Sequence, residues 1–129
     1  MPSKQILVID DEADIREVAQ LSIEVTTDWQ VLTAASGTEG LDLAIAYHPD
    51  AILLDIMMPG MDGLITWQYL QENPHTQDIP IVFLTAKVQA KEQRRYAQLG
   101  ATAILTKPFD PTTLGDAIAE VLGWAAFPQ

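Results

Sequence analysis

Cysteine is absent from this 129-residue chain, and so is any long apolar segment. Without cysteine there is neither a disulfide framework nor a thiolate metal site, which agrees with a reducing compartment. No apolar run approaches the roughly 18 residues that span a bilayer. Carboxylates also follow the N-terminus too closely to leave room for the apolar core of a signal peptide. We therefore expect a cytoplasmic protein without membrane contact, stabilised by packing alone.

Positive charge is scarce as well. Seven Lys and Arg residues stand against 18 Asp and Glu residues, for a net charge of −11. Such a chain repels phosphate backbones, so we expect no direct binding to nucleic acid. The length and the 48% content of hydrophobic residues suit one globular domain over residues 1–129.

Five short apolar runs rich in β-branched residues predict strands. Segments with helical spacing of apolar residues separate them, and the first of these carries the stripe Ile15, Val18, Leu21 and Val25. Ser36 and Gly37 open the second helix, Gly100 ends the fourth, and Asp110-Pro111 is a typical helix start. The predicted strands are residues 6–9, 31–35, 51–54, 81–84 and 103–105, and the last two helices are residues 88–99 and 114–122.

Continuous apolar strands that alternate with amphipathic helices predict a parallel sheet covered on both faces. The fold class is therefore α/β, with a doubly wound sheet. In such sheets the functional crevice lies beyond the carboxyl ends of the strands, where the strand order reverses. The residues that follow each strand are thus the candidates for function.

Four of the five predicted strands lead into residues that could do phosphoryl or metal chemistry. Asp10 and Asp11 follow the first strand, Asp55 the third, Thr85 the fourth and Lys107 the fifth. Three carboxylates brought to one edge repel each other, and one lysine leaves about two negative charges uncompensated by simple counting. The group therefore predicts a bound divalent cation.

The ligand types indicate which cation is bound. Carboxylate and carbonyl oxygens suit Mg²⁺ or Mn²⁺, and the group lacks the His or Cys expected for zinc. Mg²⁺ with few protein ligands points to phosphoryl chemistry, in which Asp55 is the best candidate for the nucleophile. Glu12 and Asp14 suit equally well the positive N-terminal end of the first helix, so a capping role stays open for both.

Four ordered motifs carry a resemblance that spans the whole chain. They are IDDE at 9–12, LLDIMMPGMDG at 53–63, LTA at 84–86 and TKPF at 106–109. Together they resemble the motif set of the receiver domain of two-component response regulators. The resemblance implies a flavodoxin-like fold with five parallel strands in the order 2-1-3-4-5.

The resemblance also implies a function for each motif. Asp55 would accept a phosphoryl group from a histidine kinase or a phosphotransfer protein. Asp10, Asp11 and Asp55, with the backbone carbonyl of Met57, would surround Mg²⁺. Thr85 and Lys107 would bind the phosphoryl group, and Lys107-Pro108 would be a cis peptide.

In the family, phosphorylation alters a face that includes the fourth helix. Here that segment contains Lys87, Lys91, Arg94 and Arg95, so we expect it to dock an acidic protein partner, with a solvated helix face as the alternative. Family members often carry an aromatic residue three positions before the lysine, where this chain has Ile104. Coupling between the threonine and an aromatic ring therefore cannot be carried over.

Residues 123–129 form a short apolar tail, and we expect no output domain within this sequence. We expect a stand-alone receiver or a domain cut from a longer protein, with Trp124 and Phe127 folded back on the body or in contact with a partner.

Three other functions are compatible with parts of the sequence. A flavodoxin-type electron carrier would need a phosphate-binding loop where this chain has acidic residues. A Mg²⁺-dependent phosphatase of the haloacid dehalogenase class would need an acid at position 57, which is Met57. A docking module that is never phosphorylated remains an alternative. We expect a phosphoacceptor signalling protein rather than an enzyme, with only self-phosphotransfer and autodephosphorylation.

Overall fold

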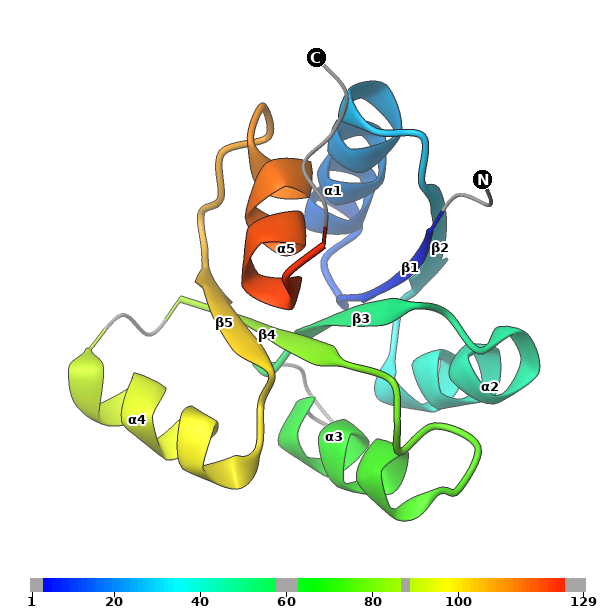
Figure 1. Ribbon diagram of the computed structural model, residues 1–129, viewed down its shortest axis with the longest axis vertical. Coiled ribbons are helices and arrows are strands. Elements are labelled where there is room, and N and C mark those ends of the chain that lie inside the picture. Colours follow the sequence, from blue (N-terminus) through cyan, green and yellow to red (C-terminus); the bar gives the residue numbers. More distant parts are fainter. Residues whose placement is uncertain (1–3, 58–62, 87–88, 125–129) are drawn as a thin grey trace.

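Strands and helices alternate five times in the computed structural model, which describes residues 4–57, 63–86 and 89–124 (Figure 1). All neighbouring strands pair in parallel, in the order β2-β1-β3-β4-β5. The predicted fold class and strand order are therefore confirmed. The strands are β1 (Gln5–Ile9), β2 (Gln30–Ala34), β3 (Ala51–Asp55), β4 (Ile81–Thr85) and β5 (Ala103–Thr106).

Helices cover both faces of the sheet. Figure 1 shows α1 and α5 on one face and α2, α3 and α4 on the other. None of the helices in the described ranges is long and apolar enough to cross a membrane. The helices are α1 (Ala13–Thr26), α2 (Gly37–Tyr47), α3 (Gly63–Glu72), α4 (Ala90–Leu99) and α5 (Leu114–Leu122).

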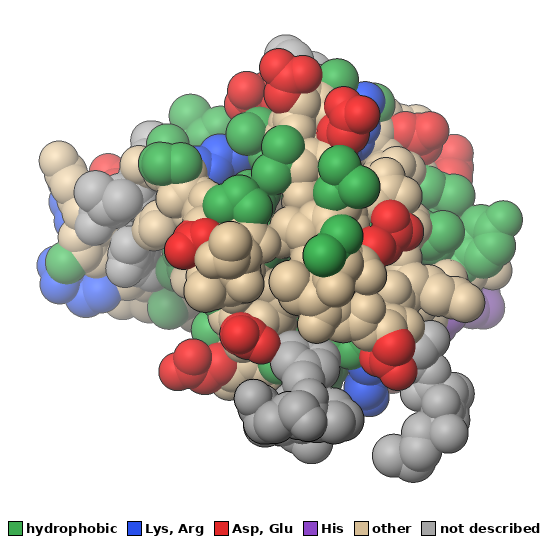
Figure 2. Space-filling view, turned by 90° about the horizontal axis from the view of Figure 1, so that it is seen from above, with side chains coloured by type: hydrophobic (Ala, Val, Ile, Leu, Met, Phe, Trp, Pro, Cys, Tyr) green, Lys and Arg blue, Asp and Glu red, His purple; other side chains and the backbone are tan. Residues whose placement is uncertain are grey.

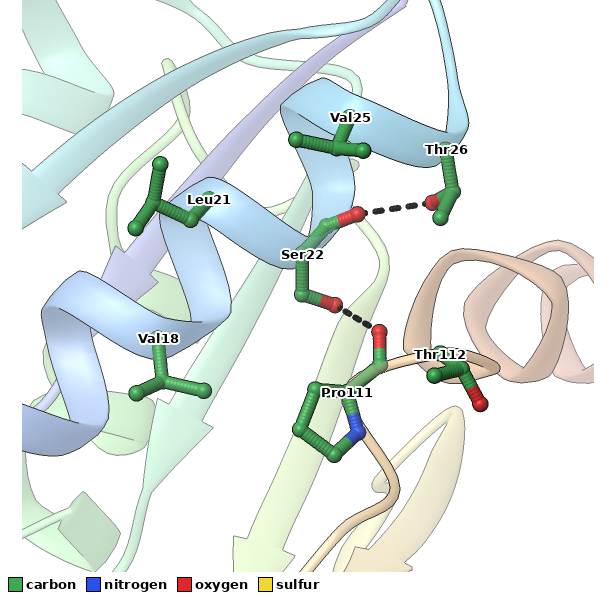
Figure 3. A pocket seen from close by; sticks show the side chains of 7 residues that line it. All are labelled: Val18, Leu21, Ser22, Val25, Thr26, Pro111 and Thr112. Atoms are coloured by element: carbon green, nitrogen blue, oxygen red, sulfur yellow. Dashed lines mark hydrogen bonds between the residues drawn. The ribbon is translucent and has the colours of Figure 1, made fainter.

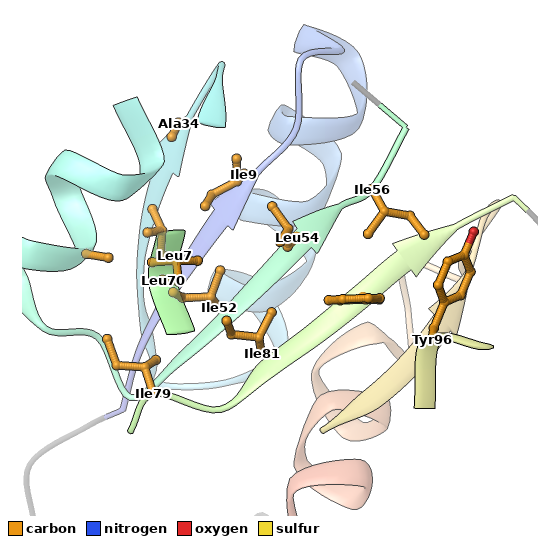
Figure 4. Close-up of a cluster of buried hydrophobic side chains, with 12 residues drawn as sticks. Leu7, Ile9, Ala34, Ile52, Leu54, Ile56, Leu70, Ile79, Ile81 and Tyr96 are labelled. Atoms are coloured by element: carbon orange, nitrogen blue, oxygen red, sulfur yellow. The ribbon is translucent and has the colours of Figure 1, made fainter. Parts of the chain in front are cut away.

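The central strands are buried on both faces, which explains why their sequences are apolar without interruption. Successive residues of β1 point to opposite sides, so Leu7 and Ile9 join one hydrophobic cluster while Ile6 and Val8 join the other. Figure 4 shows the first cluster, in which residues of β1, β3 and β4 pack beneath α2, α3 and α4. The sheet thus packs between two hydrophobic clusters, which fix the positions of its strand ends.

Two of the signals predicted to mark helix ends are confirmed, and a third lies before its helix. Ser36 accepts a hydrogen bond from the Glu39 amide at 3.1 Å and caps α2, and Gly100 ends α4 with φ 108°. The predicted range of the fifth helix, residues 114–122, is also confirmed, but Asp110-Pro111 does not mark its start. The Asp110 carboxylate accepts the Thr112 amide at 2.9 Å in a turn that precedes α5, whose first residue is Leu114.

Only Ile15 of the apolar stripe of α1 packs against the hydrophobic core. Val18, Leu21 and Val25 are 41%, 56% and 79% exposed, while the helix buries Ala19, Ser22 and Ile23. The Ser22 hydroxyl donates to the Pro111 carbonyl and so joins α1 to the segment before α5. The stripe instead lines a cavity, shown in Figure 3.

The described part of the C-terminal tail folds back on the body. The ring of Trp124 packs edge-on against Trp29, with centroids 5.0 Å apart, and Lys4 Nζ lies 4.9 Å from the Trp124 ring. The prediction for Trp124 is therefore confirmed, whereas Phe127 lies outside the described residues.

Candidate functional site

The sheet brings Asp10 and Asp55 side by side. Strands β1 and β3 are neighbours, and Ile9 stands opposite Leu54 in their register. The next residues along the two strands are Asp10 and Asp55, so both carboxylates reach the same edge of the sheet. Asp10 is fully buried and Asp55 is 1% exposed.

Four carboxylates gather at this edge. Asp10, Asp11, Glu12 and Asp55 each offer an oxygen, and the four oxygens lie within 4.8 Å of one another. The three aspartates were predicted to meet here. Glu12 was left open as a helix cap, but its side chain caps nothing in α1 and belongs to the acidic cluster instead.

Lys107 is the cation that faces this cluster. Its Nζ lies 3.0 Å from Asp10 Oδ2, 3.1 Å from Asp55 Oδ2 and 3.4 Å from Glu12 Oε1. The lysine is held there by the sheet, because its amide donates to the Thr85 carbonyl at 2.8 Å just beyond β4 and β5. The Lys107-Pro108 peptide is cis, as the resemblance implied.

Backbone amides hold the other oxygens of the two buried carboxylates. Asp10 Oδ1 accepts the Glu12 amide, and Asp55 Oδ1 accepts the Met57 amide, both at 2.9 Å. Asp10 Oδ2 accepts no hydrogen bond from any described residue, although Lys107 lies near it. This buried oxygen therefore has an ion pair but no hydrogen bond, which leaves it available to a further ligand.

The pKa values report how crowded the cluster is. Burial raises the pKa of Asp10 to about 6, and the nearby charge of Asp55 adds to the rise, although the Glu12 amide and Lys107 oppose it. Burial lowers the pKa of Lys107, but its contacts with Asp10 and Asp55 outweigh this effect, so the net pKa is raised. Lys107 therefore stays charged, and one buried carboxylate lacks full compensation.

One side chain near the cluster was missed from the sequence. Arg16, in the first turn of α1, donates from Nη1 to the backbone carbonyl of Asp10 at 2.9 Å. It is the only Lys or Arg of α1, which could have drawn attention to it. The contact itself depends on the path of the loop between β1 and α1, which no periodicity reports.

The other predicted residues have mixed outcomes. Thr85 is fully buried at the end of β4, on the edge that carries the acidic cluster. The Met57 side chain is 55% exposed, and its carbonyl remains only a predicted ligand. Lys91, Arg94 and Arg95 are exposed on α4, away from this site. Residues 58–62 and Lys87 lie outside the described residues.

A family model for the response regulator receiver domain matches residues 6–119. The chain belongs to this family. The receiver domain is 38% identical over 117 residues to the response regulator Rre1 of Synechocystis sp., which covers 91% of this chain and 51% of that protein. It is 41% identical over 114 residues to the response regulator PleD of Caulobacter vibrioides, covering 87% of this chain and 24% of PleD.

Solved structures show the same likeness. The chemotaxis protein CheY4 of Vibrio cholerae superposes with a TM-score of 0.85 at 29% identity, covering 93% of this chain and 99% of CheY4. The curated relatives are longer. The chain spans 44% of RpaA of Synechocystis sp., which is described as a DNA-binding transcriptional regulator, and about half of Rre1.

Proposed function

We propose that this receiver domain accepts a phosphoryl group on Asp55 and thereby changes a surface that binds another protein. The donor is a histidine kinase or a phosphotransfer protein. The observation that carries the proposal is the environment of Asp55. Its buried carboxylate lies beside Asp10 and 3.1 Å from the ammonium of Lys107. The domain is thus a signalling protein, and its chemistry is confined to its own aspartate.

In the proposed reaction an oxygen of Asp55 attacks the phosphorus atom of the donor. A new oxygen–phosphorus bond forms as the bond between phosphorus and the donor nitrogen or oxygen breaks, and the leaving group takes that electron pair. Lys107 is close enough to hold a phosphoryl oxygen, and the Thr85 hydroxyl is proposed to hold another. Their positive charge and hydrogen bonding favour the charge that develops during transfer.

Mg²⁺ is the proposed metal, with Mn²⁺ as a substitute. The proposed ligands are Asp10, Asp11, Asp55 and the carbonyl of Met57. The donor set fits because it consists of oxygen atoms only and includes Asp10 Oδ2, a buried oxygen that accepts no hydrogen bond from the described residues. When bound, Mg²⁺ supplies positive charge that screens the cluster and the incoming phosphoryl group.

The proposed phosphodonor docks on the exposed apolar strip of α1, defined as Val18, Leu21 and Val25. The helix begins three residues after Asp10, so a partner on this strip is close to the acceptor. Figure 2 shows hydrophobic side chains gathered on this side of the molecule with acidic side chains around them. Exposed Glu17 and Glu24 lie on the same helix, which suits a donor helix with apolar residues flanked by Lys or Arg.

Phosphorylation adds charge at Asp55, and Thr85 and Lys107 are proposed to move toward the new oxygens. Because Thr85 ends β4 and Lys107 follows β5, both strands couple the site to α4. The proposed downstream partner is an acidic protein segment that binds α4. Ile104 packs in the same core cluster as Phe83 of β4 and Tyr96 of α4. The proposed coupling between the site and α4 therefore runs through this packing rather than through an aromatic ring at position 104.

The central experiment incubates the protein with Mg²⁺ and acetyl phosphate and measures intact mass. We expect one phosphoryl adduct on the wild type, none on Asp55→Asn, and an adduct on the control Asp42→Asn, whose carboxylate is exposed on α2. The absence of an adduct on the wild type with acetyl phosphate and with histidine kinases would favour a docking module that is never phosphorylated.

A further inference from the structure

Arg16 makes a contact that none of the proposed phosphoryl chemistry uses. Its guanidinium reaches back over the loop between β1 and α1, and Nη1 donates to the Asp10 carbonyl at 2.9 Å. The side chain is half-buried, whereas the exposed cations of α4 contact no described carboxylate. Among the described residues, this arginine donates to a backbone oxygen and forms no ion pair with the carboxylates of the cluster.

This bond completes a small network around the acidic loop. The Glu12 amide donates to the Asp10 carboxylate at 2.9 Å, and the Arg16 amide donates to the Glu12 carbonyl at 3.0 Å. The Arg16 side chain then closes the circuit at the Asp10 carbonyl. Asp11 lies between Asp10 and Glu12, whose backbones both take part in this network.

We propose that Arg16 is a positioning residue for the metal site, which fixes the loop that carries Asp10 and Asp11 in the geometry that binds Mg²⁺. The inference rests on the proposed Mg²⁺-dependent function. Arg16 acts through the backbone of Asp10 and touches neither the metal nor the phosphoryl group. Residues that orient metal ligands commonly change metal affinity by about 10-fold to 100-fold when they are replaced.

The charge of Arg16 and its hydrogen bond predict opposite results. A positive charge beside a cation site weakens metal binding, so its removal alone would tighten Mg²⁺ binding. Loss of the hydrogen bond frees the loop, so ordering it again opposes binding and weakens it. Replacement by a neutral residue therefore reveals by its sign which effect dominates, and the positioning role requires weaker binding.

The experiment measures the Mg²⁺ dissociation constant by isothermal titration calorimetry for the wild type, Arg16→Gln and Arg16→Lys. We expect Arg16→Gln to raise the constant by about 10-fold. Arg16→Lys keeps the charge and one donor, so its constant should fall between the other two. In the metal-free protein, we also expect faster hydrogen exchange at the amide of Glu12 in Arg16→Gln than in the wild type.

A control separates positioning from general loss of stability. Thr76 is buried in the segment before β4, at the amino-terminal ends of the strands and thus away from the acidic cluster. Its hydroxyl donates to the Leu70 carbonyl at 2.7 Å. Thr76→Val should lower stability and leave the Mg²⁺ dissociation constant unchanged. At saturating Mg²⁺, Arg16→Gln should be phosphorylated by acetyl phosphate within about 2-fold of the wild-type rate, because Arg16 does not touch the reacting atoms.

The outcomes separate this inference from the proposed function. A wild type that does not bind Mg²⁺ contradicts the proposed function itself. A wild type that binds, with Arg16→Gln binding equally or more tightly, overturns the role of Arg16 alone. Equal weakening by Thr76→Val also overturns it. If Arg16→Gln does not fold, Arg16→Lys decides the question: a dissociation constant about 3-fold above wild type supports positioning, and an unchanged or lower one refutes it.

Discussion

The ammonium of Lys107 lies 3.1 Å from Oδ2 of Asp55, although 52 positions separate the two residues in the chain. The contact exists because β3, β4 and β5 run parallel and deliver their carboxyl ends to one edge. The contact joins the proposed acceptor to the residue that follows β5, which is an outermost strand of the sheet. A change of charge at Asp55 therefore acts directly on the ammonium of Lys107, at the end of β5.

Replacement of Lys107 by Met should destabilise the domain. The change leaves the buried carboxylates of Asp10 and Asp55 without their cation, and removal of one partner from a buried ion pair costs on the order of 3 kcal/mol. Urea unfolding at pH 7.5 without divalent metal measures the loss. Lys91→Met, at an exposed position on α4, should stay within about 0.5 kcal/mol of the wild type. Equal stability of the two variants would contradict the buried ion pair.

Asp10 should make the metal-free protein less stable as the pH rises. Burial raises its folded-state pKa from 3.8 to about 6, so the folded protein binds a proton that the unfolded chain releases between these values. The stabilising effect is complete below pH 3.8 and is lost as the pH passes about 6. The charged groups that face Asp10 are Asp11, Glu12, Asp55 and Lys107.

Asp10→Asn tests this dependence. The variant should be more stable than the wild type at pH 7.5 without metal, by an amount on the order of 1 to 3 kcal/mol. The gap should shrink toward pH 4. Chemical unfolding at several pH values measures it, with Asp42→Asn on the surface of α2 as a control that should show no such gap. A gap that is constant with pH would show that the carboxylate of Asp10 is not the cause.

Mg²⁺ should make the wild type more stable than Asp10→Asn, which reverses the order expected without metal. At a concentration of about 100 times its dissociation constant, a ligand that binds only the folded state adds about 2.7 kcal/mol. Thermal unfolding should therefore show a clear rise in Tm for the wild type and a much smaller one for Asp10→Asn. Equal shifts in both proteins would mean that Mg²⁺ acts elsewhere on this acidic surface.

The sheet could be predicted because the sequence of each central strand, taken alone, shows that the strand is buried on both faces. Strands covered on both faces need apolar residues at every position, and the runs of β1, β3 and β4 show this directly. The acidic cluster followed from the same reasoning, since parallel strands bring Asp10 and Asp55 to one edge. The three aspartates of the cluster were thus predictable from topology, whereas the place of Glu12 was not.

Features that depend on packing between helices were not predictable. The stripe of α1 has correct helical spacing, but nothing in that spacing indicates that Ala19 and Ser22 face inward and leave Leu21 exposed. Asp110-Pro111 did not mark the start of α5, because Asp110 caps a separate turn with the same chemistry as a helix cap. The Arg16 contact also required the three-dimensional path of the loop.

Gly63 should tolerate no side chain. A Cβ at this position would lie 2.1 Å from the Ile56 Cα and 2.4 Å from the Asp55 carbonyl oxygen, so backbone next to the proposed acceptor would have to shift. We expect Gly63→Ala to cost at least about 3 kcal/mol in unfolding free energy. It should also slow phosphorylation by acetyl phosphate, because Asp55 is displaced.

Gly40→Ala is the matched comparison for this change. There a Cβ would lie 2.3 Å from Ile9 Cδ1, the flexible end of a side chain rather than backbone. The loss of stability should be smaller than for Gly63→Ala, and phosphorylation should be unaffected once the protein is folded. A larger loss at Gly40 than at Gly63 would show that the loop after Asp55 adjusts easily.

The cations of α4 should contribute to binding and not to stability. Lys91 lies in the first turn, where a positive charge opposes the helix dipole, and Lys91, Arg94 and Arg95 form no ion pair with the described carboxylates. Arg94→Glu/Arg95→Glu should therefore change the unfolding free energy by no more than about 0.5 kcal/mol.

The same variant should lose most of its affinity for a fluorescent Glu-rich peptide, measured by anisotropy at low salt after phosphorylation. Lys4→Glu, a reversal at another exposed site, should bind the peptide as the wild type does. Unchanged binding by the α4 variant would leave its cations as a solvated helix face.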